Sequence, residues 1–137
     1  MADKARRIDY VTIQIADEPG AASRVFKSLK DAGVNLLAAV GFPTAKGKAQ
    51  LSLVPADPAA LSKAARVPGI AVSAQKQAFF IQGADRVGAV AEVLTKLAEA
   101  KINVTALSAT AAQPGNFGMV LWVKPENVAK ASTALGV

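Results

Sequence analysis

The sequence contains no cysteine and no histidine among its 137 residues. Without cysteine the chain can form no disulfide bond and has neither a thiolate nucleophile nor a cysteine metal ligand. Without histidine it lacks the usual general base at neutral pH and the commonest transition-metal ligand. We therefore expect a protein that is not an enzyme and that holds no metal and no cofactor. The lack of cysteine also fits a cytoplasmic protein.

Long hydrophobic runs are missing too. No apolar run approaches the roughly 20 residues that span a bilayer. The first ten residues, MADKARRIDY, carry charges but no apolar segment after them, so we expect no secretory signal and no membrane contact. Hydrophobic residues make up 52% of the chain and aromatic residues only 5%, which is typical of a globular protein with an aliphatic core.

Acidic residues are outnumbered, because 16 lysines and arginines stand against 10 aspartates and glutamates and give a net charge of +6. The basic residues are spread along the chain. The densest cluster is Lys4, Arg6 and Arg7, in a terminus that we expect to fray. This distribution favours a basic solvated surface over a nucleic-acid site and makes nucleic acid an unfavoured partner.

The chain contains the same pattern twice. A shift of 68 positions (85 minus 17) aligns Asp17 with Asp85 and Gly20 with Gly88, and it aligns Asn35 with Asn103. The apolar residues between them also align at the same helical spacings. Because 68 is almost half of the length, the sequence predicts one module used twice. We expect domain boundaries at residues 1–75 and 76–137.

Hydrophobic periodicity and turn residues predict the elements of each copy. In the first copy, we expect strands at 10–15, 34–42, 49–54 and 70–75, a helix that starts with Asp17 as an acidic cap and ends at Gly33, and a second helix from 55–58 to about 66. In the second copy, we expect strands at 78–82, 102–110 and 119–123, and helices at about 90–101 and 125–135.

The element order βαββαβ indicates the ferredoxin-like arrangement, an antiparallel sheet with both helices on one face. The predicted fold class is therefore α+β, with two ferredoxin-like βαββαβ modules in tandem. The second module lacks its last strand. Residues 69–75, the N-terminus or another chain could supply one.

The repeated residues have the chemistry of a small-molecule site. A helix N-terminus offers backbone N–H groups and a partial positive charge, which suit a carboxylate. Gly20 and Gly88 would let a ligand approach the backbone, while Asp17 and Asp85 would attract an ammonium group. A free amino acid matches both features.

One module cannot bring its aspartate and its asparagine together, because a helix of about 12 residues is about 18 Å long. Two antiparallel modules can. We therefore predict that Asp17 approaches Asn103 and that Asp85 approaches Asn35, in two related pockets. If the modules pair between chains instead, Asp17 would meet Asn35 of a neighbouring chain.

The segment DEPGAASRVFKSLKDAGVNLLAAVG resembles the opening of an ACT domain, a small regulatory module of amino-acid metabolism. The chain is most similar to the ACT pairs of aspartate kinases, and the resemblance covers residues 8–135 as two copies. In the second copy Val87 stands where the first has Pro19. The resemblance implies a regulator without catalytic activity that binds an amino acid between paired ACT domains. It does not imply which amino acid, which pathway or which target protein.

The resemblance places the ligand at the first strand–helix loop and at the start of the second strand of each copy. The implied ligand-binding residues are Asp17, Pro19, Gly20, Ala21, Asn35 and Leu36, and Asp85, Val87, Gly88, Ala89, Asn103 and Val104. Serine-binding relatives carry a histidine at the position of Ile15, so serine bound in that way is not expected.

Three further expectations accompany this interpretation. An apolar chain with exposed edge strands favours a homodimer. An enzyme or another regulator is a further expected partner. The alternatives are a regulator that acts only through protein partners and a ferredoxin-like module that binds single-stranded nucleic acid, a fold with the same element order.

Overall fold

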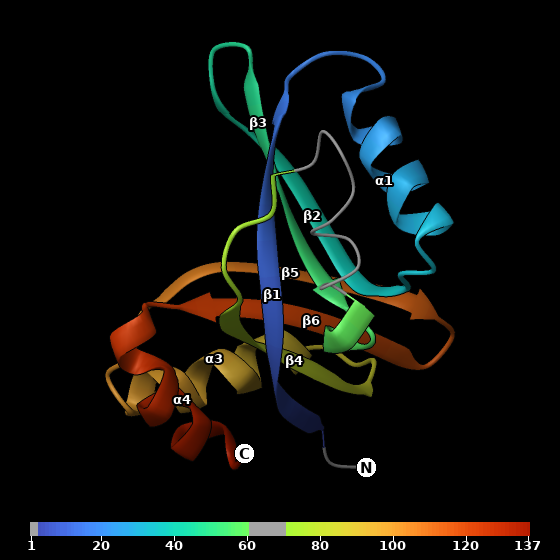
Figure 1. Cartoon of the computed structure of the whole chain (residues 1–137). Coiled ribbons are helices and arrows are strands. Elements are labelled where there is room, and N and C mark those ends of the chain that lie inside the picture. The colour runs from blue at the N-terminus through green and yellow to red at the C-terminus, as the bar shows by residue number, and fades with distance from the viewer. Residues whose placement is uncertain (1–2, 61–70) are drawn as a thin grey trace. The chain divides into compact units, whose positions relative to one another are not determined.

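The computed structural model describes residues 3–60 and 71–137, and their contacts define two compact units. We call Asp9–Lys76 the first unit. The second unit combines residues up to Ile8 with Gln77–Val137. Strand β1 (Lys4–Ala16) is therefore divided between them (Figure 1). The sequence places residues 1–75 in one domain, whereas the structure groups the first eight residues with the second copy.

In the described part of the first unit, helix α1 packs against a three-stranded antiparallel sheet. Its elements are β1 from Asp9 onward, α1 (Ala21–Asp31), β2 (Leu36–Ala45) and β3 (Lys48–Pro55), and the strand order is β2-β3-β1. Helix α1 buries Val25 and Leu29 against Ile13 and Leu53 of the sheet. The apolar spacing of the helix thus faces the alternating apolar side of the strands, as the sequence predicts.

Two predicted elements of the first unit have different outcomes. The second helix begins at residues 58–60, and its predicted continuation to residue 66 lies outside the described residues. The prediction of a fourth strand at 70–75 is wrong for residues 71–75, the part of this range that the structure describes. Only an antiparallel bridge between Val72 and Ile13 remains, beside hydrogen bonds that join Ser73 to the backbone of Thr12.

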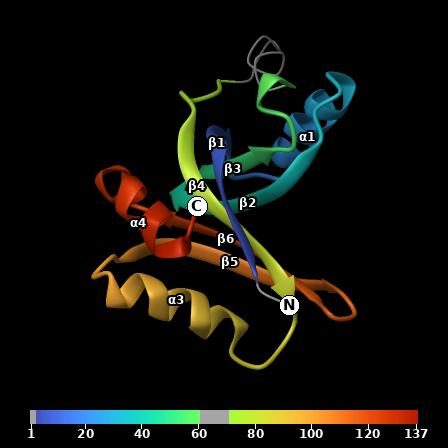
Figure 2. The ribbon, with the colours of Figure 1, turned by 90° about the horizontal axis from the view of Figure 1, so that it is seen from below.

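The second unit has the same architecture, with helices packed against an antiparallel sheet (Figure 2). Its elements are β4 (Lys76–Ala84), α3 (Ala89–Glu99), β5 (Val104–Gln113), β6 (Asn116–Val123), the short 3₁₀ helix η1 (Pro125–Asn127) and α4 (Val128–Leu135). Leu97 and Ala131 from the two helices pack with Phe79 and Leu121 of the sheet in one apolar core. The predicted α+β class with ferredoxin-like modules is confirmed.

The N-terminal segment supplies the strand that the second copy lacks, since the strand order of this unit is β1-β4-β6-β5. The Arg7 guanidinium donates to Gln77 Oε1 at 2.9 Å, and Arg6 lies over the Phe80 ring at 5.5 Å. Arg7 contacts Gln77, and Arg6 contacts Phe80 further along β4. The residue numbers therefore fall along β1 as they rise along β4, so the two strands run antiparallel. The expected fraying of Lys4, Arg6 and Arg7 is wrong, because β1 begins at Lys4.

Among the described residues, no helix is both long enough and apolar enough to cross a lipid bilayer.

Candidate functional site

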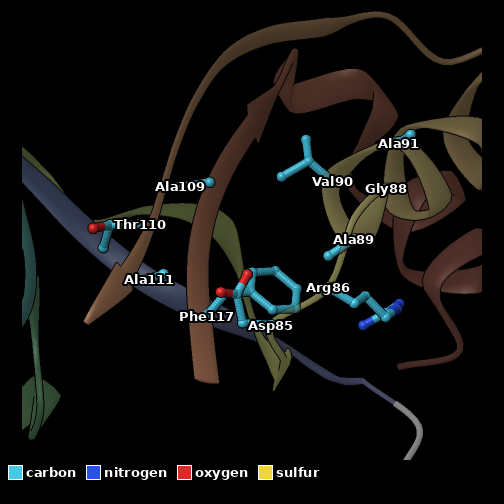
Figure 3. A pocket seen from close by; sticks show the side chains of 10 residues that line it. All are labelled: Asp85, Arg86, Gly88, Ala89, Val90, Ala91, Ala109, Thr110, Ala111 and Phe117. Atoms are coloured by element: carbon cyan, nitrogen blue, oxygen red, sulfur yellow. The ribbon is translucent and has the colours of Figure 1, made fainter. Parts of the chain in front are cut away.

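A cavity of about 290 Å³ opens beside the loop between β4 and α3, within the second unit (Figure 3). Asp85, Gly88 and Ala89 form its wall at the start of the helix. The opposite wall is β5 at Ala109 and Ala111, and its side chains are small. Three of the predicted ligand-binding residues therefore line one cavity.

The loops before α1 and α3 have the same backbone geometry. Gly20 and Gly88 are the N-cap residues, with φ angles of 88° and 87°. Such positive φ values are easy for glycine and strained for residues with a Cβ atom. Ala89 is buried directly after its glycine. The backbone conformation therefore explains the glycine at both positions without reference to a ligand.

The acidic cap expected at Asp17 is wrong, and Asp85 does not cap its helix either. Neither helix has a side-chain hydrogen bond at its cap, and each N-cap is the glycine three residues later. The backbone N–H of Asp17 donates to Gly47 O at 3.0 Å, and that of Asp85 donates to Gly115 O at 2.9 Å. Each loop is thereby tied to the following hairpin, while both aspartates remain exposed.

Arg86, which also lines the cavity, forms a polar cluster at its edge. Its guanidinium donates to both carboxylate oxygens of Asp3, at 3.0 and 3.1 Å, and to Ala84 O at 2.9 Å. It also forms an ion pair with Glu92 in the first turn of α3. The hydrogen bonds to Asp3 and Glu92 raise the pKa of Arg86 above its ordinary value.

The first unit has the opposite charges at the aligned positions. Glu18 corresponds to Arg86 and Arg24 corresponds to Glu92, and the Arg24–Glu18 pair lies at 3.4 Å with both side chains well exposed. The sequence analysis did not single out this cluster. The sequence feature that could have indicated this cluster is the reversal of charge between the two copies, at positions 18 and 86 and at positions 24 and 92.

The other predicted site residues lie away from the cavity or serve the cores. Val87 is fully exposed, and Pro19 is exposed. Ala21 is buried in α1. Leu36 packs against the core of the first unit, and Val104 packs against that of the second.

Both asparagines are exposed and directly precede β2 and β5. An 11-residue helix of about 16 Å lies in the chain between each aspartate and its own asparagine. A helix of that length agrees with the expectation that neither unit alone brings Asp17 to Asn35 or Asp85 to Asn103. The pairing of Asp17 with Asn103, and of Asp85 with Asn35, stays a prediction.

Other chemistries find little support in the described residues. They contain no group of three or more carboxylate side chains arranged to hold a metal ion. Phe79, Phe80 and Phe117 are buried, and Trp122 is partly buried. Buried rings cannot stack on nucleic-acid bases, whereas RNA-recognition sheets expose their aromatic side chains for this contact.

No family model matches the chain, and no curated protein matches it. Solved structures do match over nearly the whole length. Protein BT0572 from Bacteroides thetaiotaomicron has a TM-score of 0.81 and 21% identity, covering 96% of this chain and 88% of that one. The regulatory subunit of aspartate kinase from Thermus thermophilus, in its ligand-free form, has a TM-score of 0.65 and 15% identity, with coverage of 99% and 95%.

The regulatory subunit of aspartate kinase from Thermus flavus has a TM-score of 0.63 and 17% identity, covering 98% of this chain and 94% of that one. The chain has the fold of these regulatory subunits. The ACT-like fold expected from the sequence is thereby confirmed, and at such identities the likeness concerns the fold alone.

Proposed function

We propose that this ACT-like protein is a non-catalytic regulator that binds a small amino acid at the loops before α1 and α3. The observation that carries the proposal is the cavity beside Asp85, Gly88 and Ala89. An exposed carboxylate and the start of a helix lie together there and match the ammonium and carboxylate groups of an amino acid. The small side chains of Ala109 and Ala111 favour a small ligand.

The first unit carries the same backbone arrangement at Asp17 and Gly20, so the proposal includes a second, related site. Each site is completed by the asparagine of another module, from the same chain or from a second chain. The protein acts as a homodimer and transmits effector binding to an enzyme or another regulator. The likeness in fold to regulatory subunits of aspartate kinase supports a regulatory function.

The test is thermal unfolding of the full chain against each of the twenty amino acids. An effector at about a hundred times its dissociation constant should stabilise the protein by roughly 2.7 kcal/mol. Asp17→Ala and Asp85→Ala should each remove one site and reduce the shift. Asp31→Ala is the matched control, because Asp31 is an equally exposed aspartate at the other end of α1. No shift with any amino acid would leave regulation through protein partners as the better interpretation.

The proposed partner asparagines can be tested with double variants. If Asp17 and Asn103 form one pocket, Asp17→Ala/Asn103→Ala should bind as many effector molecules as either single variant. Asp17→Ala/Asn35→Ala should lose both pockets. The opposite pattern would assign Asp17 and Asn35 to one pocket, as expected for modules paired between chains.

A further inference from the structure

The N-terminal segment reaches the loop of the proposed effector site through Asp3. The Asp3 side chain is only 12% exposed, and both of its carboxylate oxygens accept hydrogen bonds from Arg86. Arg86 directly follows Asp85, the acidic group of the cavity. A residue 83 positions away in the sequence therefore fixes the direction of the arginine in this loop.

Gly83 makes room for this contact. A Cβ atom at position 83 would lie 2.0 Å from Asp3 Oδ1 and 3.1 Å from the Phe117 ring. The aligned position in the first copy is Ile15. The second copy thus combines a glycine on β4 and an arginine in the loop with an aspartate from β1, and the first copy has Ile15 and Glu18 in place of the glycine and the arginine. This asymmetry is a property of the chain that the repeat does not explain.

We propose that Asp3 is a positioning residue for the second-unit site: it holds the guanidinium of Arg86, a residue of the cavity lining, in a direction away from Asp85 and thereby sets the charge preference of the bound amino acid. The proposal rests on the proposed function. Figure 3 shows the Arg86 side chain extending away from the Asp85 carboxylate. Its donors are engaged by Asp3, Ala84 O and Glu92.

Arg86 also lines the cavity, but its guanidinium is engaged by Asp3 and Glu92, so the Asp85 carboxylate is the unengaged charge of the described lining. Such a cavity attracts the ammonium group of any amino acid and repels a second carboxylate. It therefore selects amino acids with neutral side chains over aspartate and glutamate. Loss of the Asp3 charge would free Arg86 to turn toward the cavity and to accept a dicarboxylic ligand.

The first experiment needs no effector. Hydrogen exchange of the backbone amides from Asp85 to Ala89 is measured in the full chain carrying Asp3→Asn or Gly83→Ala. Both variants break the same contact from opposite sides, and both should speed exchange in this loop about tenfold. Glu99→Gln is the charge-matched control, because Glu99 is an exposed acid at the far end of α3. Unchanged exchange in both variants would overturn the proposal.

The second experiment measures charge preference by calorimetry in an Asp17→Ala background, where only the second-unit site remains. The probes are L-asparagine and L-aspartate, which differ by one charge, together with the amino acid that stabilises the wild type most. Asp3→Asn should shift the ratio of affinities toward L-aspartate by about tenfold. An equal loss of affinity for all probes would show a merely structural contact and would reject the proposal. If the wild type binds none of the twenty amino acids, the proposed function fails, and the exchange experiment still decides whether Asp3 positions the loop.

Discussion

The two copies of the module differ most clearly in single residues at aligned positions. Glu18 and Arg24 form a solvent-exposed ion pair. Arg86 instead forms ion pairs with both Glu92 and the nearly buried Asp3. The same position thus bears an exposed ion pair in one copy and a partly buried network in the other. Exposed pairs contribute little to stability, while a buried carboxylate depends on its cation.

Arg86→Ala should clearly lower the free energy of unfolding, because it leaves the Asp3 carboxylate without its two hydrogen bonds. Glu18→Ala at the aligned position should change it by less than about 0.5 kcal/mol. Urea denaturation of both variants measures the difference. Equal losses of stability at the two positions would show that the contact with Asp3 does not stabilise the protein.

The residue that follows the C-cap of α1, and the one that follows the C-cap of α3, offer a second matched comparison. Gly33 and Lys101 are aligned, and their φ angles are 74° and 60°. A lysine in this left-handed region is strained, and glycine is not. Lys101→Gly should therefore stabilise the protein by about 0.5–1 kcal/mol, and Gly33→Lys should destabilise it by a similar amount. Thermal unfolding of the two variants gives the sign, and a loss of stability in Lys101→Gly would contradict the strain argument.

At the scale of elements, local patterns were sufficient wherever the determining residues lie close in sequence. The periods of the apolar residues predicted α1 and α3. The strand that completes the second unit was left among three alternatives. Its pairing joins residues 70 or more positions apart, and no local pattern encodes such a partner.

The site shows the same limit. The sequence indicated the loops at Asp17 and Asp85 because turn residues recur there. It assigned the first cap to Asp17, since aspartate is a preferred N-cap residue, whereas the N-cap of each helix is a glycine. The contact between Asp3 and Arg86 was invisible, because it depends on which strand lies beside β4.

Deletion of residues 2–8 tests the part played by the N-terminal segment as an element. The edge of β4 would lose its partner strand, and Ala5 would no longer pack on the core of the second unit. Amides of β4 should exchange with solvent markedly faster, while amides of β2 and β3 should change less. Hydrogen exchange resolves the two groups in one measurement. Equal acceleration in both would show that the segment stabilises the chain as a whole.

At the scale of the whole molecule, likeness in fold extends over nearly the entire chain while identity stays between 15% and 21% for the structures compared. A fold can persist at such identities because its core needs only apolar side chains of suitable size at the right spacings. Ligand choice depends on a few polar groups, so it does not follow from the fold. The charge clusters that distinguish the two copies are therefore the better guide to the effector.

Whether the proposed sites are completed within one chain or between two chains can be decided by mixing variants. Asp17→Ala and Asn35→Ala are prepared separately, and calorimetry counts the effector molecules bound per chain. If Asp17 pairs with Asn103 of its own chain, each variant keeps one site, and the mixture binds the average of the two. If Asp17 pairs with Asn35 of a second chain, mixed dimers regain one site that neither variant has alone. After unfolding and refolding together, binding should then rise above the average. A mixture of Asp17→Ala with Asp17→Ala/Asn35→Ala restores nothing in either arrangement and serves as the control.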